Sequence, residues 1–320
     1  MSESSLWNGP IVDAHHHFWD PQINHHPWLS EGVNVPFRYG DYTAIKRRYL
    51  PPEYFQDVGI HQVVQTVYVE TEWDPTDPLG EPRFIATIAA RYGVPNAVVA
   101  QAWLDRPDAV ALLTEQAAFK SVRSVRHKPG GPTSPDQVGQ QRTLMSDEGW
   151  RRSYAALHRL GLHFDLQTPW WNLPEAERLA RDFPHITLIL NHAGLPSDRS
   201  PQGLVGWHAA MSRLAEQPNV VVKISGLGQR GKPWRAEDNA WIVREIIAMF
   251  GAGRAMFASN FPVDSLCGSF DDIYSGFKHI VRDLPRADQE RLFYSNAQRI
   301  YRCEPCVSEQ PWREQLRSEA

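Results

Sequence analysis

Apolar residues recur along the chain in two alternating patterns, short β-branched runs and longer amphipathic segments. Runs typical of buried strands begin at residues 11, 59, 97, 121, 162, 186, 220 and 255. Segments with helical periodicity follow most of these runs, at Gly80–Tyr92, Pro107–Phe119, Asp147–Leu160, Pro174–Phe183, Leu204–Gln217, Ala236–Phe250, Phe270–Arg282 and Arg286–Arg302. Eight alternating units of this length predict an α/β protein, a single (β/α)8 TIM barrel over residues 11–302.

The rest of the chain divides into two tails and one long connection. Residues 1–10 are predicted to form an N-terminal tail and residues 303–320 a charged C-terminal tail. The connection Pro21–Phe55 is rich in proline and aromatic residues, and its length predicts a functional loop or lid. An open doubly wound sheet is the alternative fold, but no glycine-rich dinucleotide-binding turn follows the first strand.

The composition is that of an ordinary globular protein. Of the 320 residues, 42% are hydrophobic and 22% are charged, and the formal net charge of −4 gives no basic footprint for nucleic acid. No apolar run is long enough to span a bilayer, and the polar start of the chain lacks the features of an export signal. We therefore expect a cytoplasmic protein with a small-molecule substrate and no nucleic-acid or membrane partner. The sequence leaves a homo-oligomer open.

Histidines stand where two of the predicted strands end, and a barrel of this type carries its chemistry at that face. Alternation along the first strand turns His15 and His17 to one side and His16 to the other. His192 ends the sixth strand. Imidazoles that converge in this way can bind a metal or transfer protons, so His15, His17 and His192 are candidate catalytic residues.

Other strand ends carry polar side chains that predict a binding pocket for a polar or carboxylated small molecule. The candidates are Glu70, Arg126, Gln167, Trp170 and Lys223. An arginine suits a carboxylate or a polarised carbonyl, and a tryptophan suits an apolar or aromatic ring. Because Arg126 and His127 are neighbours on a strand, we expect only one of them to face the interior. Structural ion pairs are the alternative interpretation of the charged candidates.

Taken in order, these segments resemble the amidohydrolase superfamily. The resemblance rests on the HxH pair after the first strand, the histidine after the sixth, and a Ser-Asp-Trp-Pro-like turn after the eighth. The stretch DAHHHFWDP at Asp13–Pro21 is similar to the lactonase branch, which includes L-fuconolactonase and 2-pyrone-4,6-dicarboxylate lactonase, as are Val122–His127 and Val220–Leu227. The resemblance covers residues 11–302. It implies an amidohydrolase-like barrel and a hydrolase that opens the lactone of a small polar or carboxylated molecule.

The chain departs from the family pattern at Asn260, where the turn normally carries an aspartate that is both metal ligand and general base. An amide cannot accept a proton from water at neutral pH. The resemblance then leaves His15, His17 and His192 to hold one divalent metal such as zinc, with metal-free catalysis as the alternative. The remaining candidates for the general base are a histidine, Glu70 and Asp264.

Two other functions stay open at this stage. The loss of a water-activating aspartate is compatible with a reaction that does not use water, such as that of a decarboxylase on the same scaffold. It is also compatible with a ligand-binding protein that has lost most of its catalytic power. The retained histidines favour an enzyme over this last alternative.

Overall fold

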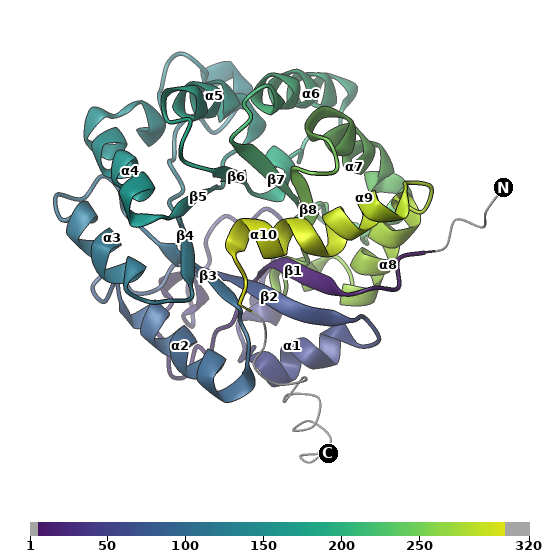
Figure 1. Cartoon of the computed structure of the whole chain (residues 1–320), viewed down its shortest axis with the longest axis horizontal. Helices are drawn as coiled ribbons and strands as arrows, with labels where there is room; N and C mark the ends of the chain where they lie inside the picture. The colour runs from purple at the N-terminus through teal and green to yellow at the C-terminus, as the bar shows by residue number, and fades with distance from the viewer. Residues whose placement is uncertain (1–5, 305–320) are drawn as a thin grey trace.

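The computed structural model describes residues 6–304, and its centre is an eight-stranded parallel sheet rolled into a barrel (Figure 1). The strands are β1 (Ile11–His16), β2 (Val63–Val69), β3 (Ala97–Gln101), β4 (Val122–Arg126), β5 (His163–Leu166), β6 (Leu188–Leu190), β7 (Val220–Ile224) and β8 (Ala255–Phe257). Each strand pairs in parallel with the next one along the chain. The predicted (β/α)8 barrel is confirmed.

The helices surround this barrel (Figure 1). They are α1 (Pro51–Val58), α2 (Gly80–Tyr92), α3 (Ala109–Ala117), α4 (Glu148–Leu160), α5 (Leu173–Asp182), α6 (Pro201–Ala215), α7 (Ala236–Phe250), α8 (Phe270–Ile280), α9 (Arg286–Glu290) and α10 (Asn296–Tyr301). Their ends follow local side-chain chemistry. The Asp147 carboxylate accepts a hydrogen bond from the Trp150 amide at 2.8 Å and starts α4, and Gly161, at φ 66°, ends it.

Two predicted segments differ from the structure in the elements that they contain. The predicted loop Pro21–Phe55 gives way at Pro51 to α1, a helix too short to show periodicity in the sequence. Proline is tolerated there because the first helical residues need no amide donor, and the Glu53 carboxylate accepts from the Leu50 amide at 2.9 Å. The predicted helix Arg286–Arg302 is instead α9 and α10, with a π-helical turn at Arg291–Ser295 between them.

Asp13 closes the barrel between its first and last strands. β8 returns to β1 through a parallel bridge between His16 and Phe261. Beneath this bridge the fully buried Asp13 carboxylate accepts from the Ser259 amide at 2.8 Å and from the Ser259 hydroxyl at 2.6 Å. It also accepts from the hydroxyls of Tyr54 at 2.8 Å and Tyr274 at 3.2 Å. One carboxylate therefore joins β1 to the end of β8 and to α1 and α8.

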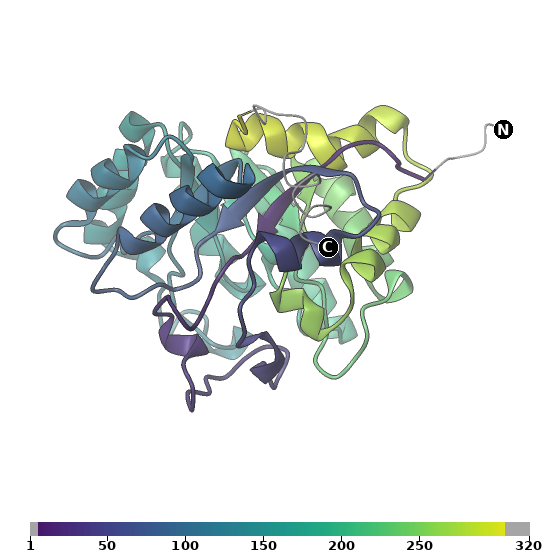
Figure 2. The same ribbon diagram turned by 90° about the horizontal axis from the view of Figure 1, so that it is seen from below.

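The two ends of the barrel are covered differently (Figure 2). The C-terminal helices α9 and α10 lie across one end, and the long connection after β1 lies at the other (Figures 1 and 2). Within the predicted tail of residues 1–10, Trp7 is buried and stacks on Phe293, with ring centroids 6.0 Å apart. Residues 1–5 and 305–320 of the predicted tails lie outside the described residues. Within residues 6–304 no helix is long and apolar enough to cross a membrane.

Candidate active site

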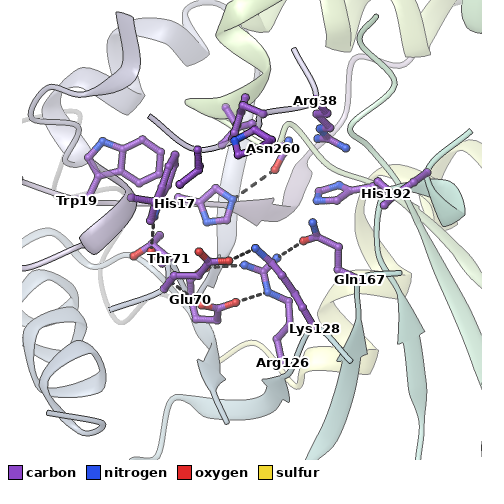
Figure 3. A pocket seen from close by; sticks show the side chains of 17 residues that line it. His17, Trp19, Arg38, Glu70, Thr71, Arg126, Lys128, Gln167, His192 and Asn260 are labelled. Atoms are coloured by element: carbon purple, nitrogen blue, oxygen red, sulfur yellow. Dashed lines mark hydrogen bonds and ion pairs between the residues drawn. The ribbon is translucent and has the colours of Figure 1, made fainter. Parts of the chain in front are cut away.

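A cavity of about 450 Å³ opens where the barrel strands end, beneath the long connection after β1 (Figure 3). The residues that line it are His17, Trp19, Trp28, Val35, Pro36, Phe37, Arg38, Glu70, Thr71, Glu72, Arg126, Lys128, Gln167, His192, Leu195, Asn260 and Val263. The lining includes six of the ten residues predicted from the sequence. His15, Asp264, Trp170 and Lys223 lie elsewhere.

The three predicted histidines converge at the inner end of this cavity. The ring centroids of His15 and His17 are 5.0 Å apart, and those of His15 and His192 are 4.5 Å apart. His15 lies below the cavity lining, fully buried, and neither of its ring nitrogens has a hydrogen-bond partner within the described residues. As alternation predicts, His16 faces the other way and packs on the Tyr54 ring, with centroids 4.8 Å apart.

The tautomer of His17 follows from its partners. Nδ1 lies 2.8 Å from the Val69 carbonyl oxygen, which only accepts, so Nδ1 carries the proton. Burial first, and then the charge of Arg126, lower the pKa of His17 to about 3, so the ring is neutral and Nε2 presents a lone pair. Nε2 lies 3.3 Å from the Asn260 amide group. The Asn260 NH2 group donates to Asp264 Oδ1 at 2.6 Å, so it is the Asn260 oxygen that faces Nε2.

His192 is held at the cavity wall by an unusual backbone. It has a φ of 53°, and the following Ala193 also lies in the left-handed region, at 55°. Such strain is typical of functional sites. Gly226 leaves room for the ring, since a Cβ atom there would lie 2.8 Å from the imidazole Nδ1. That same Nδ1 lies 2.9 Å from the Ser225 hydroxyl. Burial, and after it the charge of Arg38, hold the pKa of His192 well below its usual value, so the imidazole is neutral.

Glu70 and Arg126 form a buried ion pair in the lining of the cavity (Figure 3). Arg126 donates from Nε to Glu70 Oε1 at 2.5 Å, from Nη2 to the Glu70 carbonyl at 2.7 Å, and from Nη1 to Gln167 Oε1 at 3.0 Å. Burial alone would raise the pKa of Glu70, but Arg126 and Lys128 hold it below its usual value. These predicted binding residues therefore do come together, and much of their hydrogen-bonding capacity is spent on one another. His127, as expected, faces away and accepts from Trp150 Nε1 at 2.9 Å.

Besides His15, three predicted residues do not line the cavity. Lys223, the next-to-last residue of β7, is fully buried in the barrel interior, with Nζ 2.8 Å from Asp165, and it does not line the cavity. Trp170 packs against α6, where a Cβ on Gly206 would lie 2.4 Å from its ring. Asp264 is buried behind Asn260, whose Nδ2 donates to it at 2.6 Å. Asp264 contacts the cavity lining through Asn260 and Arg38, and its catalytic role stays a prediction.

The structure also brings in residues that the sequence did not single out. Arg38, on the long connection, reaches into the site with Nη2 3.5 Å from Asp264 Oδ1. The hydroxyl of the neighbouring Tyr39 donates to the same oxygen at 2.9 Å. Lys128, just after β4, pairs with Glu72. The only sequence signal for Arg38 was the length of its loop, which carries no periodicity that places single side chains.

The loop that carries Arg38 is fixed by aromatic side chains. Phe37 stacks on Trp28 with ring centroids 5.9 Å apart. Trp28 Nε1 donates to the Thr71 carbonyl at 2.8 Å, and the Tyr42 hydroxyl donates to the Trp28 carbonyl at 3.0 Å. Trp28 and Phe37 are half-buried and Tyr42 is buried, and packed rings whose polar atoms are bonded restrict the backbone around them. The predicted functional loop therefore forms an ordered wall of the cavity.

The donors of the site can be compared with the needs of a divalent metal. The unpartnered nitrogens of His15 would suit one. However, within residues 6–304 no group of three or more His, Cys, Asp or Glu side chains is arranged to hold a metal ion. Asn260 replaces the carboxylate, and the charges of Lys223 and Arg126, acting after burial, lower the pKa of His15 and oppose a further cation. As they stand, the described side chains do not form a divalent-cation site, and a metal at His15, His17 and His192 stays a prediction.

Comparison with known proteins gives the family. The sequence model of a protein family described as amidohydrolase matches residues 12–303 of this chain. The protein y4mH of Sinorhizobium fredii is 40% identical over 297 residues, covering 91% of this chain and 98% of that protein. An L-fucono-1,5-lactonase of Burkholderia ambifaria is 28% identical over 305 residues, covering 91% and 95%. A crystal structure of a Burkholderia multivorans amidohydrolase with bound zinc has a TM-score of 0.74 at 24% identity, covering 92% and 100%. The chain belongs to the amidohydrolase family and is a hydrolase.

Proposed function

We propose that this hydrolase opens a lactone, the cyclic ester of a small polar molecule, by attack of water. The observation that carries the proposal is the pairing of His192, a neutral imidazole, with Arg38, a cation that keeps free donors, on the lining of one cavity. Similarity to L-fucono-1,5-lactonases along nearly the whole chain supports the same reaction class. The substrate within that class is a separate question.

His192 is the proposed general base. With Nδ1–H donating to the Ser225 hydroxyl, Nε2 carries a lone pair that takes a proton from water as its oxygen attacks the carbonyl carbon. The tetrahedral intermediate then collapses, the ring C–O bond breaks, and the proton passes from His192 to the departing alkoxide. The product is a hydroxy acid. An ester needs less activation than an amide, so a neutral imidazole without an aspartate suits a lactone better than a peptide-like bond.

Arg38 is the proposed oxyanion partner. Arg126 already donates from all three of its guanidinium nitrogens, to Glu70 and Gln167. Within the described part of the chain, the polar contact of Arg38 in the site is its ion pair with Asp264, at 3.5 Å. Several of its N–H groups therefore remain available to a ligand. Fixed donors directed at the developing negative charge act strongly in a site that excludes water.

The proposal is tested by assaying the purified protein on a panel of sugar and aromatic lactones, following the acid released. Replacing a general base is expected to lower kcat about 10²- to 10⁴-fold, so His192→Ala should lose most of its turnover. His185→Ala, an exposed histidine on the outside of the barrel, is the matched control. The assay is run after dialysis against EDTA and again with added Zn²⁺, and we expect turnover in both. No turnover above the His192→Ala variant on any lactone would refute the proposal.

A further inference from the structure

A second hollow of about 350 Å³ lies beside the candidate active site. The two hollows share Trp28, Val35 and Glu72 in their linings, so they are neighbours at the same end of the barrel. Beyond the shared residues, Trp73 and Trp103 contribute aromatic surface to the second hollow. Neither of these two residues lines the first cavity. A ligand that extends past Glu72 would therefore enter a space with its own walls.

Gln101, at the end of β3, gives this hollow an unused acceptor. Its backbone carbonyl accepts from Gln116 Nε2 at 2.6 Å, so the main chain is satisfied. Its side-chain Oε1 is buried and has no hydrogen-bond partner within residues 6–304. A buried acceptor without a partner is costly, and the cost is recovered when the half-buried Gln101 side chain turns so that a ligand hydroxyl can donate to Oε1. This atom favours a ligand with hydroxyl groups over a purely apolar one.

The aromatic walls are half-buried and held in place. Trp73 packs edge-on against His26, with ring centroids 5.1 Å apart. Gly80 makes room for its indole, because a Cβ there would lie 2.4 Å from Nε1. The Arg106 guanidinium lies 5.8 Å from the Trp103 ring centroid. Half-buried indoles held in this way offer apolar surface on which the C–H face of a ring can pack.

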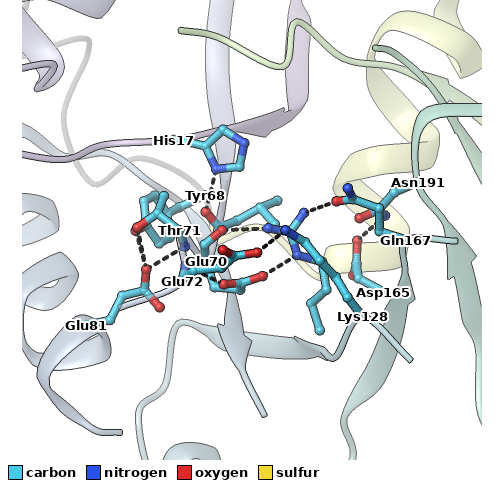
Figure 4. A network of polar contacts seen from close by, with 12 residues as sticks. His17, Tyr68, Glu70, Thr71, Glu72, Glu81, Lys128, Asp165, Gln167 and Asn191 are labelled. Atoms are coloured by element: carbon cyan, nitrogen blue, oxygen red, sulfur yellow. Dashed lines mark hydrogen bonds and ion pairs between the residues drawn. The ribbon is translucent and has the colours of Figure 1, made fainter. Parts of the chain in front are cut away.

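Glu72 stands between the two hollows in a strained conformation. Its φ of 56° is unusual for a residue with a side chain. It is held there because its amide donates to Glu70 Oε2 at 2.7 Å, and its carboxylate pairs with Lys128 (Figure 4). Backbone strain of this kind is kept where the position of a side chain matters. Here it places a charged pair at the border that a two-part ligand would cross.

We propose that the hollow lined by Trp73, Gln101 and Trp103 is a second subsite, which binds a hydroxylated ring attached to the lactone. The substrates of this enzyme would then be two-ring molecules, such as the lactones of disaccharide aldonic acids. The lactone ring occupies the cavity of His192 and Arg38, and the second sugar ring packs between the indoles and donates a hydroxyl to Gln101. This inference rests on the proposed lactonase function.

The test compares kcat/KM for a monosaccharide 1,5-lactone with that for cellobionolactone and lactobionolactone. A stacked ring with one new hydrogen bond is expected to favour the two-ring lactones about tenfold. Trp103→Ala and Gln101→Leu should each remove most of that preference while the one-ring rate is kept. Trp241→Ala is the control, since this tryptophan is 45% exposed on α7. Melting temperatures check that every variant is folded.

The possible results separate the two proposals. Equal kcat/KM for one- and two-ring lactones in the unmodified enzyme would overturn the subsite, and so would an equal loss on both substrates in Trp103→Ala. A preference for lactones with long alkyl chains would overturn its assignment to a hydroxylated ring. If no lactone is turned over, binding of lactobionate is measured by calorimetry. Binding that Trp103→Ala abolishes would then support the subsite although the lactonase proposal has failed.

Discussion

At the scale of single residues, the two arginines of the site differ in how many of their N–H donors are free to bind a ligand. The guanidinium of Arg126 is bonded to Glu70 and Gln167 at 2.5 to 3.0 Å, so its role is to hold that wall together. The guanidinium of Arg38 meets Asp264 at 3.5 Å, and its side chain is 23% exposed. A donor that is positioned but not saturated can strengthen its bonds as charge develops on a substrate.

Replacing Arg38 tests this difference. Arg38→Met keeps a similar length without the charge, and loss of an oxyanion donor is expected to lower kcat about 10²- to 10³-fold. Arg38→Lys should recover part of the rate, because it keeps the charge but not the planar donor fork. Steady-state kinetics on the best lactone give both values. If Arg38→Met changed KM alone and left kcat intact, Arg38 would be a binding residue rather than an oxyanion partner.

Prediction of single residues succeeded where the alternation of a strand decides the side to which each side chain points. Alternation placed His15 and His17 inside and His16 outside, and it separated Arg126 from His127. It failed where side chains come from irregular backbone or from below the strand ends. Arg38 lies on a loop without a repeating pattern, and the sequence does not show that Lys223, although near the end of β7, points into the barrel interior and pairs with Asp165. The amide at Asn260 was visible in the sequence, but its bond to Asp264 was not.

At the scale of elements, the end of β2 and the start of α2 form a polar unit beneath the cavity. Glu81, in the first turn of α2, accepts at Oε1 from the Thr71 amide at 2.7 Å and from the Thr71 and Tyr68 hydroxyls, each at 2.8 Å. The other carboxyl oxygen has no partner in the described part of the chain. Burial first, and then the charge of Glu70, raise the pKa of Glu81 from 4.5 to about 7. The helix was predicted over its full length, but this bond pattern depends on how it packs.

This element predicts a pH-dependent stability. Between the two pKa values the folded protein holds a proton on Glu81 that the unfolded chain has released. The contribution of Glu81 to the free energy of unfolding is therefore fully present below pH 4.5. It is lost as the pH rises toward and through 7. The loss amounts to about 3 kcal/mol at most. Glu81→Gln, which keeps the acceptor for Thr71, should abolish this dependence and melt higher than the unmodified protein at pH 8.

Urea unfolding of both proteins at pH 5 and pH 8 measures the effect. The difference in unfolding free energy between the two pH values should be smaller in Glu81→Gln. Glu290→Gln, an exposed residue at the end of α9, is the control and should behave as the unmodified protein does. Parallel pH profiles for Glu81→Gln and the unmodified protein would show that Glu81 is ionised in the folded state.

At the scale of the whole molecule, the site exists only because the barrel closes. His15 lies near the end of β1, His17 follows that strand, and Asn260 follows β8. The backbone N–H of Asn260 donates to the His15 carbonyl oxygen at 2.8 Å. The order of the elements was predictable, since eight alternating units leave few arrangements for a parallel sheet. The closing contact was not, because Asp13 and Ser259 are 246 residues apart in sequence.

Asp13 should therefore stabilise the molecule more than any surface ion pair. Asp13→Ala leaves buried donors from Ser259, Tyr54 and Tyr274 without an acceptor, and a loss of about 3 to 5 kcal/mol in unfolding free energy is expected. Asp13→Asn keeps one acceptor oxygen, and the hydroxyls can turn to accept from its NH2 group, so its loss should be about 1 to 2 kcal/mol. Urea unfolding measures both. The contacts that close the barrel also place His15 next to Asn260, so Asp13→Asn protein that folds should keep lactone turnover. Normal stability of Asp13→Ala would show that the barrel closes without this carboxylate.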